Sequence, residues 1–201
     1  GFFTKKEEAE LHIKAGAKRV VIYAPTKSED VPTIVIGANE DKLDGSSTVI
    51  SNASCTTNSV AAVMSILDEA FGIEKAMLTT VHSYTASQKL QDAPSKDLRE
   101  ARSAAENIVP TTTGAAIAVA KTVPQLKGKF DGLSVRVPTP VVSLSDVTIL
   151  FKKDVTVEDI NSVFKKAVKE PFYQGILDVS EEPLVSGDYI GNSHSGIVDL
   201  L

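Results

Sequence analysis

The chain contains one cysteine, Cys55, within the polar segment Ser51-Asn52-Ala53-Ser54-Cys55-Thr56-Thr57-Asn58. Apolar side chains then recur every three or four residues up to Gly72, which predicts an amphipathic helix that opens within a residue or two of Cys55. Unpaired amides and the positive end of the helix dipole stabilise a thiolate at that position. The alternative is a small buried side chain, since free cysteine is commonly buried. The polar flanking residues favour a nucleophilic thiol.

A thiol nucleophile requires a base, and the chain offers three histidines. His12 lies in a charged helical segment, and His194 lies in a polar turn. His82 instead ends the apolar run 76–81, which predicts a buried strand that continues into a polar loop. Catalytic side chains are often found on such loops above a rigid support. We therefore take His82 as the candidate base.

Two further features have the chemistry of anion-binding groups. Thr111-Thr112-Thr113-Gly114 precedes a helix of small residues, so hydroxyls and free amides converge where phosphate could bind, but the same residues also suit a plain N-cap. Arg136 lies between Val135 and Val137 in an expected strand. It is either a surface cation that extends to solvent or an anion clamp. The residues alone leave both alternatives open.

The elements that position these groups fall into two parts. The pattern of residues 1–53 predicts the end of a parallel α/β sheet. Its helix is expected to begin with a capping box at residues Thr4 to Glu7 and to end at Gly16. Short strands are expected at 19–24 and 33–37, as edge pieces of a larger sheet, and residues 39–50 read as a polar connector.

From Ser54 onward, the pattern predicts one mixed sheet with helices on one face. Strands are expected at 132–137 and 142–151, and a helix is expected from Thr156 to about Lys169, before Pro171. The polar stretch 83–107 is too long for an ordinary connection, which indicates a functional or interfacial loop.

Composition narrows the function classes. The 201 residues are 42% hydrophobic and 23% charged, enough for one substantial core and one to two domains. A net charge of −5 without a dense basic run argues against nucleic acid as the main ligand. One cysteine excludes an internal disulfide, and an active thiol needs a reducing compartment. No apolar stretch approaches the length of a membrane span and no signal peptide is evident, so we expect a cytoplasmic protein without a membrane partner. We also expect no metal site.

Four motifs, in this order, resemble glyceraldehyde-3-phosphate dehydrogenase: SNASCTTNSVA, LTTVHSYTASQ, IVPTTTGAA and VRVPTP. The resemblance begins at GFFTKKEEAELHIKAGAKRVVIYAP and IVIGANEDKL and extends to SEEPLVSGDYIGNSHSGIVDL. It implies that residues 1–53 are the C-terminal part of an NAD-binding Rossmann domain and that residues 54–201 are the catalytic domain. No Gly-x-Gly-x-x-Gly fingerprint is present, and family members continue into a further strand and helix, so we expect a chain truncated at both ends.

The resemblance assigns roles to individual residues. Cys55 becomes the nucleophile and His82 the group that activates it and handles the proton. Ser54, Thr56, Thr113 and Gly114 would line the site for inorganic phosphate, while Thr85 and Arg136 would hold the substrate's own phosphate. One departure weakens the inorganic-phosphate site. Many members carry adjacent arginines where this chain has Arg99 followed by Glu100, and Arg102 is the residue that could compensate.

The implied function is glycolytic. Glyceraldehyde-3-phosphate would be oxidised to 1,3-bisphosphoglycerate through a cysteine thioester, with NAD as cofactor and inorganic phosphate as second substrate. The resemblance also implies a homotetramer, in which the loop 83–107 packs near a neighbouring subunit's cofactor. Alternatives remain: erythrose-4-phosphate dehydrogenase, thioester hydrolysis by the Cys55 and His82 pair, or a catalytically silent interface module. Because hydride transfer needs a bound nicotinamide, we expect little dehydrogenase activity from this chain alone.

Overall fold

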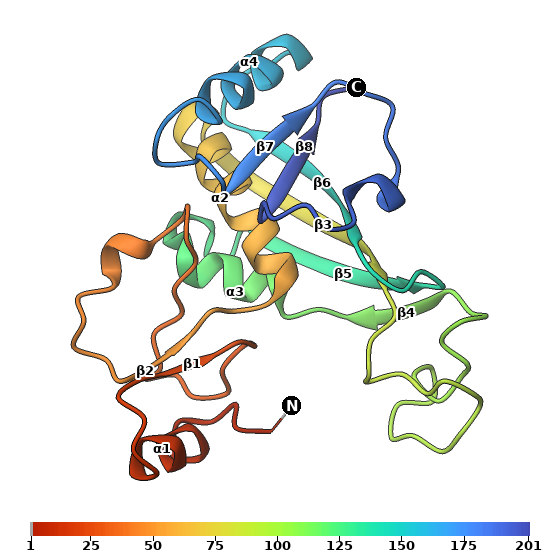
Figure 1. Ribbon diagram of the computed structural model, residues 1–201. Helices are drawn as coiled ribbons and strands as arrows, with labels where there is room; N and C mark the ends of the chain where they lie inside the picture. Colours follow the sequence, from red (N-terminus) through yellow and green to blue (C-terminus); the bar gives the residue numbers. More distant parts are fainter. Residues whose placement is uncertain (1) are drawn as a thin grey trace.

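The computed structural model describes residues 2–201 and has a central sheet in the order β4-β5-β3-β6. β3 pairs with β5 in parallel, whereas the β3/β6 and β4/β5 pairs are antiparallel. Helices α2, α3 and α4 gather on one side of this sheet, and the separate pair β7/β8 lies beyond α2 (Figure 1). The predicted mixed sheet with helices on one face is confirmed. The elements are α1 (Lys6–Lys14), β1 (Val20–Ile22), β2 (Val49–Ser51), α2 (Cys55–Phe71), β3 (Ile73–Ser83), β4 (Val109–Thr112), α3 (Ala115–Thr122), β5 (Phe130–Val137), β6 (Ser143–Phe151), α4 (Val157–Ala167), β7 (Leu177–Ser180) and β8 (Gly196–Asp199).

Alternation along the strands decides which side chains the helices cover. In β3, the buried side chains of Ala76, Leu78, Thr80 and His82 point to one face, two residues apart. They join a core that the inward face of α2 fills with Val60, Met64 and Leu67, among others. Burial of this apolar stripe holds α2 against the sheet and so fixes the position of its first residue, Cys55.

The N-terminal part has a small core of its own. Ala9, Ile22, Val31 and Val49 form a second buried cluster, under α1 and the parallel β1/β2 pair. In Figure 1 this part lies beside the larger sheet, below α2 and α3. Val35 and Ala53 belong to the larger core instead, and the predicted domain boundary at residue 53 stays a prediction.

Three local predictions in this part were wrong. The helix begins after Lys5, one residue later than predicted, and the Lys5 amide donates to Glu8 Oε2; the other half of a capping box is absent, because a lysine side chain cannot accept a hydrogen bond. Residues 33–37 are not a strand: Asn39 accepts a hydrogen bond from the Val35 amide and donates one to the Thr33 carbonyl, which folds the segment into a turn. Only a single bridge joins Thr33 to Ser51. The predicted connector 39–50 in turn contributes the first residues of β2.

The later elements follow their patterns closely. α2 ends at Gly72, whose φ of 68° suits glycine, and α4 begins after the N-cap Thr156. Residues 84–108, all of them described, form turns and bends between β3 and β4 (Figure 1), which fits the long loop that the sequence predicts.

Candidate active site

The N-terminus of α2 presents Cys55 as its first helical residue. Ser54 is the N-cap, and its Oγ accepts a hydrogen bond from the Thr57 amide at 3.1 Å. The preceding Ala53 is buried and has a φ of 59°, a conformation that costs a non-glycine residue about 1–2 kcal/mol. Its amide donates to Ser51 Oγ, which holds this sharp turn from β2 into the helix. Cys55 is accessible to solvent at the end of the turn, although its neighbours partly desolvate the sulfur.

His82 reaches the thiol from the covered face of the sheet. Its Nε2 lies 3.3 Å from Cys55 Sγ, and its Nδ1 lies 2.7 Å from the Ser83 carbonyl oxygen. The predicted strand is longer than the run 76–81, so that His82 sits within β3 rather than after it. A base held by strand pairing on both sides is fixed in orientation. The thiol and imidazole are therefore within reach for proton transfer.

The contact between these two groups changes the pKa of both. The hydrogen bond from His82, helped by its charge and by Thr56, lowers the pKa of the Cys55 thiol from 9.0 to about 7, against the opposing effect of burial. The same hydrogen bond raises the pKa of His82, while burial and the nearby Arg136 charge lower it. Each shift favours the charged form of its group, the thiolate of Cys55 and the imidazolium of His82.

Arg136 is the third member of this cluster. β5 pairs with β3 in a register that sets Arg136 directly beside His82. Its Nη1 lies 2.7 Å from His82 Nδ1 and 3.4 Å from the Ser83 carbonyl, while its Nε is buried and has no hydrogen-bond partner among residues 2–201. A partly buried guanidinium with an unused donor is suited to an anion.

The other predicted residues are placed by their own local contacts. Thr56 is buried directly after Cys55 in the first turn of α2, and it helps to lower the pKa of the thiol. Thr113 Oγ1 accepts from the Ala115 amide, and Gly114 is the N-cap of α3, a helix that packs on α2. Thus α3 begins as a capped helix beside α2.

Thr85 belongs to a hydrogen-bonded chain that the sequence did not predict. Its Oγ1 lies 3.1 Å from Ser87 Oγ, which in turn donates to Glu100 Oε1 at 3.0 Å. Glu100 therefore faces Thr85 and exerts its charge on Arg136. Arg102, the residue expected to compensate, is instead paired with Asp92 at 3.0 Å on the surface. The sequence offered no signal for Ser87, nor for the backbone carbonyl of Ser83.

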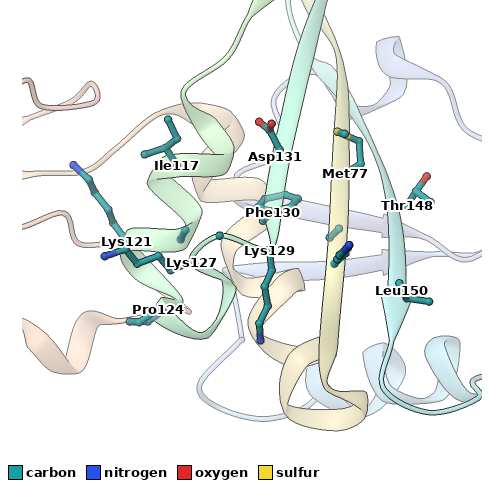
Figure 2. A pocket seen from close by; sticks show the side chains of 14 residues that line it. Met77, Ile117, Lys121, Pro124, Lys127, Lys129, Phe130, Asp131, Thr148 and Leu150 are labelled. Atoms are coloured by element: carbon teal, nitrogen blue, oxygen red, sulfur yellow. The ribbon is translucent and has the colours of Figure 1, made fainter.

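A separate hollow lies beside α3, along the ends of β3, β5 and β6. Its volume is about 1050 Å³, and Figure 2 shows Met77, Phe130 and Leu150 from the strands opposite Ile117 and Lys121 from α3. None of the candidate site residues lines it. In the part of the chain that the structure describes, no group of three or more His, Cys, Asp or Glu side chains could hold a metal ion. Likewise, no helix there is long and apolar enough to cross a membrane.

Residues 54–201 match the family model described as the C-terminal domain of glyceraldehyde 3-phosphate dehydrogenase. The chain belongs to the glyceraldehyde-3-phosphate dehydrogenase family. It is 55% identical over 202 residues to the glyceraldehyde-3-phosphate dehydrogenase of Priestia megaterium (strain DSM 319), covering 100% of this chain and 60% of that protein. The enzyme of that name from Geobacillus stearothermophilus gives the same identity and coverage.

A further glyceraldehyde-3-phosphate dehydrogenase, number 2 of Bacillus subtilis (strain 168), is 55% identical over 200 residues, or 99% of this chain and 58% of that protein. The chain thus spans about 60% of the length of these relatives. Their names do not favour the erythrose-4-phosphate alternative or a non-catalytic module. The family and the oxidoreductase class of its members agree with the Cys55, His82 and Arg136 cluster described above.

Proposed function

We propose that this chain carries the catalytic residues of a phosphorylating glyceraldehyde-3-phosphate dehydrogenase, a glycolytic oxidoreductase. The observation that carries the proposal is the 3.3 Å contact between Cys55 Sγ, at a helix N-terminus, and His82 Nε2. The thiol pKa of about 7 that follows from this contact supplies a nucleophile at neutral pH. Membership in the family supplies the substrate class.

The chain's own residues would act in two covalent stages. The Cys55 thiolate adds to the aldehyde carbon, and the resulting alkoxide takes a proton to give a hemithioacetal. His82 Nε2 would then accept the proton of that hydroxyl while the carbon loses a hydride, for which NAD, when bound, would supply the acceptor, and a thioester would remain on Cys55. An oxygen of inorganic phosphate attacks the thioester carbonyl, the carbon–sulfur bond breaks, and the thiolate is restored with an acyl phosphate as product.

The surrounding groups would hold the two phosphates. We assign the substrate phosphate to Arg136 and Thr85, because Arg136 has a buried and unused Nε–H among the described residues. For inorganic phosphate we retain Ser54, Thr56, Thr113 and Gly114, near the first turns of α2 and α3. Glu100 has the wrong charge to contribute. Fixing both anions would align the reacting carbon with Cys55.

NAD is the proposed cofactor, on the strength of the family alone. The chain has no Gly-x-Gly sequence, and β1 and β2 are joined by turns and a short 3₁₀ segment rather than by a glycine-rich turn into a helix. Residues 2–201 therefore do not form a pyrophosphate cradle, and NAD enters the mechanism above only as the hydride acceptor that it would supply when bound. We propose cytoplasmic location on the same basis.

A homotetramer is the proposed assembly of the full-length enzyme. The uncovered face of the sheet agrees with contact between subunits, since Met77, Leu133, Leu144 and Leu150 are each about half exposed or more. Analytical ultracentrifugation across protein concentrations would test this assembly. A form that stays monomeric at every concentration would contradict it.

The decisive experiment follows NADH formation by absorbance with glyceraldehyde-3-phosphate, NAD and phosphate. We would assay the 201-residue chain alone, and a chimera in which it replaces the matching 200 residues of Bacillus subtilis glyceraldehyde-3-phosphate dehydrogenase 2. We expect activity in the chimera and little in the chain alone. Cys55→Ser should abolish turnover, while His194→Gln, which changes an exposed histidine, should not. Retained turnover after Cys55→Ser would contradict the proposal.

A further inference from the structure

His82 Nδ1 has two hydrogen-bonding neighbours that require opposite protonation states of this nitrogen. The Ser83 carbonyl oxygen and Arg136 Nη1 each lie 2.7 Å from this one nitrogen. The carbonyl only accepts hydrogen bonds, so Nδ1 must carry a proton to bond with it. The guanidinium only donates, so Nδ1 must present a lone pair to bond with Arg136. The ring nitrogen cannot satisfy both partners at once.

The protonation state of Nδ1 determines whether Nε2 can accept a proton from Cys55. When a neutral imidazole accepts from Arg136 at Nδ1, its proton lies on Nε2, which faces the thiol and cannot accept a proton from it. When Nδ1–H donates to Ser83 instead, Nε2 presents a lone pair to the thiol. Only the second tautomer can act as the base for Cys55.

An anion would compete with His82 Nδ1 for the hydrogen bond that Arg136 donates. None of the ion pairs among residues 2–201 includes Arg136, and its buried Nε has no partner there. The charged groups around the ring are few: Cys55 on α2 and Arg136 on β5, with Glu100 of the loop acting on Arg136 from further away. On β6, the register partner of His82 is the uncharged Ser143. A phosphate would therefore be the strongest partner available to this guanidinium.

We propose that Arg136 is an anion-operated switch that sets the tautomer of His82. Without an anion, Arg136 donates to Nδ1 and keeps the proton on Nε2, from where it can donate a hydrogen bond to the Cys55 sulfur, but Nε2 cannot accept a proton. A bound phosphate draws the guanidinium away; the ring then loses the Nε2 proton to solvent and gains one at Nδ1, which bonds to Ser83. Nε2 is now free to take the Cys55 proton. This inference deepens the proposed function, because it assumes that His82 serves Cys55.

The test reads the protonation of each ring nitrogen and needs no turnover. Nitrogen-15 NMR of His82 would be recorded at about pH 8 in the 201-residue chain carrying His12→Gln and His194→Gln, so that one histidine remains. We expect an unprotonated Nδ1 in chloride and a protonated Nδ1 when inorganic phosphate, standing in for the substrate phosphate, saturates the Arg136 site at the same ionic strength. Calorimetry would confirm phosphate binding. Failure to bind, or binding with unchanged nitrogen signals, would overturn the switch.

Variants separate the switch from a general charge effect. Arg136→Met removes the donor at similar volume, so Nδ1 should be protonated with or without phosphate. Arg136→Lys serves as a second variant that keeps the charge, and phosphate should still change its Nδ1 signal. Arg102→Gln removes a surface charge that is paired with Asp92, and it should retain the full response to phosphate. An unprotonated Nδ1 in Arg136→Met would also overturn the proposal, whereas loss of dehydrogenase activity in the chimera concerns only the enzyme assignment.

Discussion

The two faces of the central sheet carry different kinds of side chain. On the covered face, β3 presents Leu78, Thr80 and His82, and β5 presents Ser134 and Arg136 beside them. On the open face, Met77, Leu144 and Leu150 are exposed at 51%, 62% and 55%. The covered face thus combines apolar core side chains with the polar site at its end, while the open face leaves several large apolar side chains exposed. Such exposed apolar side chains are unusual on the solvated face of a sheet.

The comparison shows how the site is assembled from distant parts of the chain. The parallel register of β3 and β5 sets His82 against Arg136, 54 residues apart in sequence, at the end of the covered face. The core below them, from Leu78 and Ala76 to α2, fixes Cys55 opposite His82. Covering this face excludes water from part of the site and strengthens its electrostatic interactions.

The largest expected difference between the faces is in stability. Leu78→Ala should lower the free energy of unfolding by about 2–5 kcal/mol, because this side chain is fully buried and its loss leaves a cavity. Leu144→Ala on the open face should change it by less than about 0.5 kcal/mol in a monomeric chain. Urea denaturation followed by circular dichroism would measure both.

The pair of variants also tests what covers the open face. An equal cost for Leu144→Ala and Leu78→Ala would contradict the contrast between the faces in the isolated chain. If that cost grew with protein concentration, the open face would be buried against a second copy, as the proposed tetramer requires.

The next expected effect is on the reactivity of Cys55. His82→Asn removes the hydrogen bond that holds the thiol pKa at about 7, so the pKa should rise toward 9.0 and iodoacetamide alkylation at pH 7 should slow by about tenfold or more. Thr79→Asn, three residues earlier in β3 and on the opposite face, is the matched control. Equal alkylation rates in His82→Asn and the control would show that His82 does not activate the thiol.

The same pKa shift makes stability depend on pH. The folded thiol has a lower pKa than the 9.0 of the unfolded chain, so its contribution is complete above about pH 9 and is lost as the pH falls through about 7. His82→Asn should flatten this part of the stability curve. An unchanged curve would mean that the thiolate is not stabilised by folding.

Much of the candidate site could be predicted from the local pattern of apolar and polar residues in the sequence. The helix at Cys55 was predictable because its apolar period, polar opening and terminal Gly72 agree with one another. The strand before His82 was predictable because its apolar run is compact. Both features depend on side chains that are near one another in sequence.

Other features depend on backbone groups or distant partners that no local pattern contains. Ala53 adopts a left-handed conformation without glycine, because Ser51 holds its amide. The apolar run 33–37 has strand composition, yet the Asn39 side chain takes the hydrogen bonds that a neighbouring strand would need. The contact of Arg136 with His82 depends on strand register, which the sequence leaves open.

The smallest expected effect concerns two buried hydroxyls on the covered face. Thr80 and Ser134 pair in register, one step below His82 and Arg136, and neither Oγ has a hydrogen-bond partner among the described residues. Because a buried hydroxyl without a partner costs the folded state about 1–3 kcal/mol, Ser134→Ala should change the free energy of unfolding by less than about 1 kcal/mol or increase it. Urea denaturation of Ser134→Ala, Thr80→Val and the double variant would measure this. A larger loss in each single variant, without further loss in the double variant, would instead indicate a buried water that bridges the two hydroxyls.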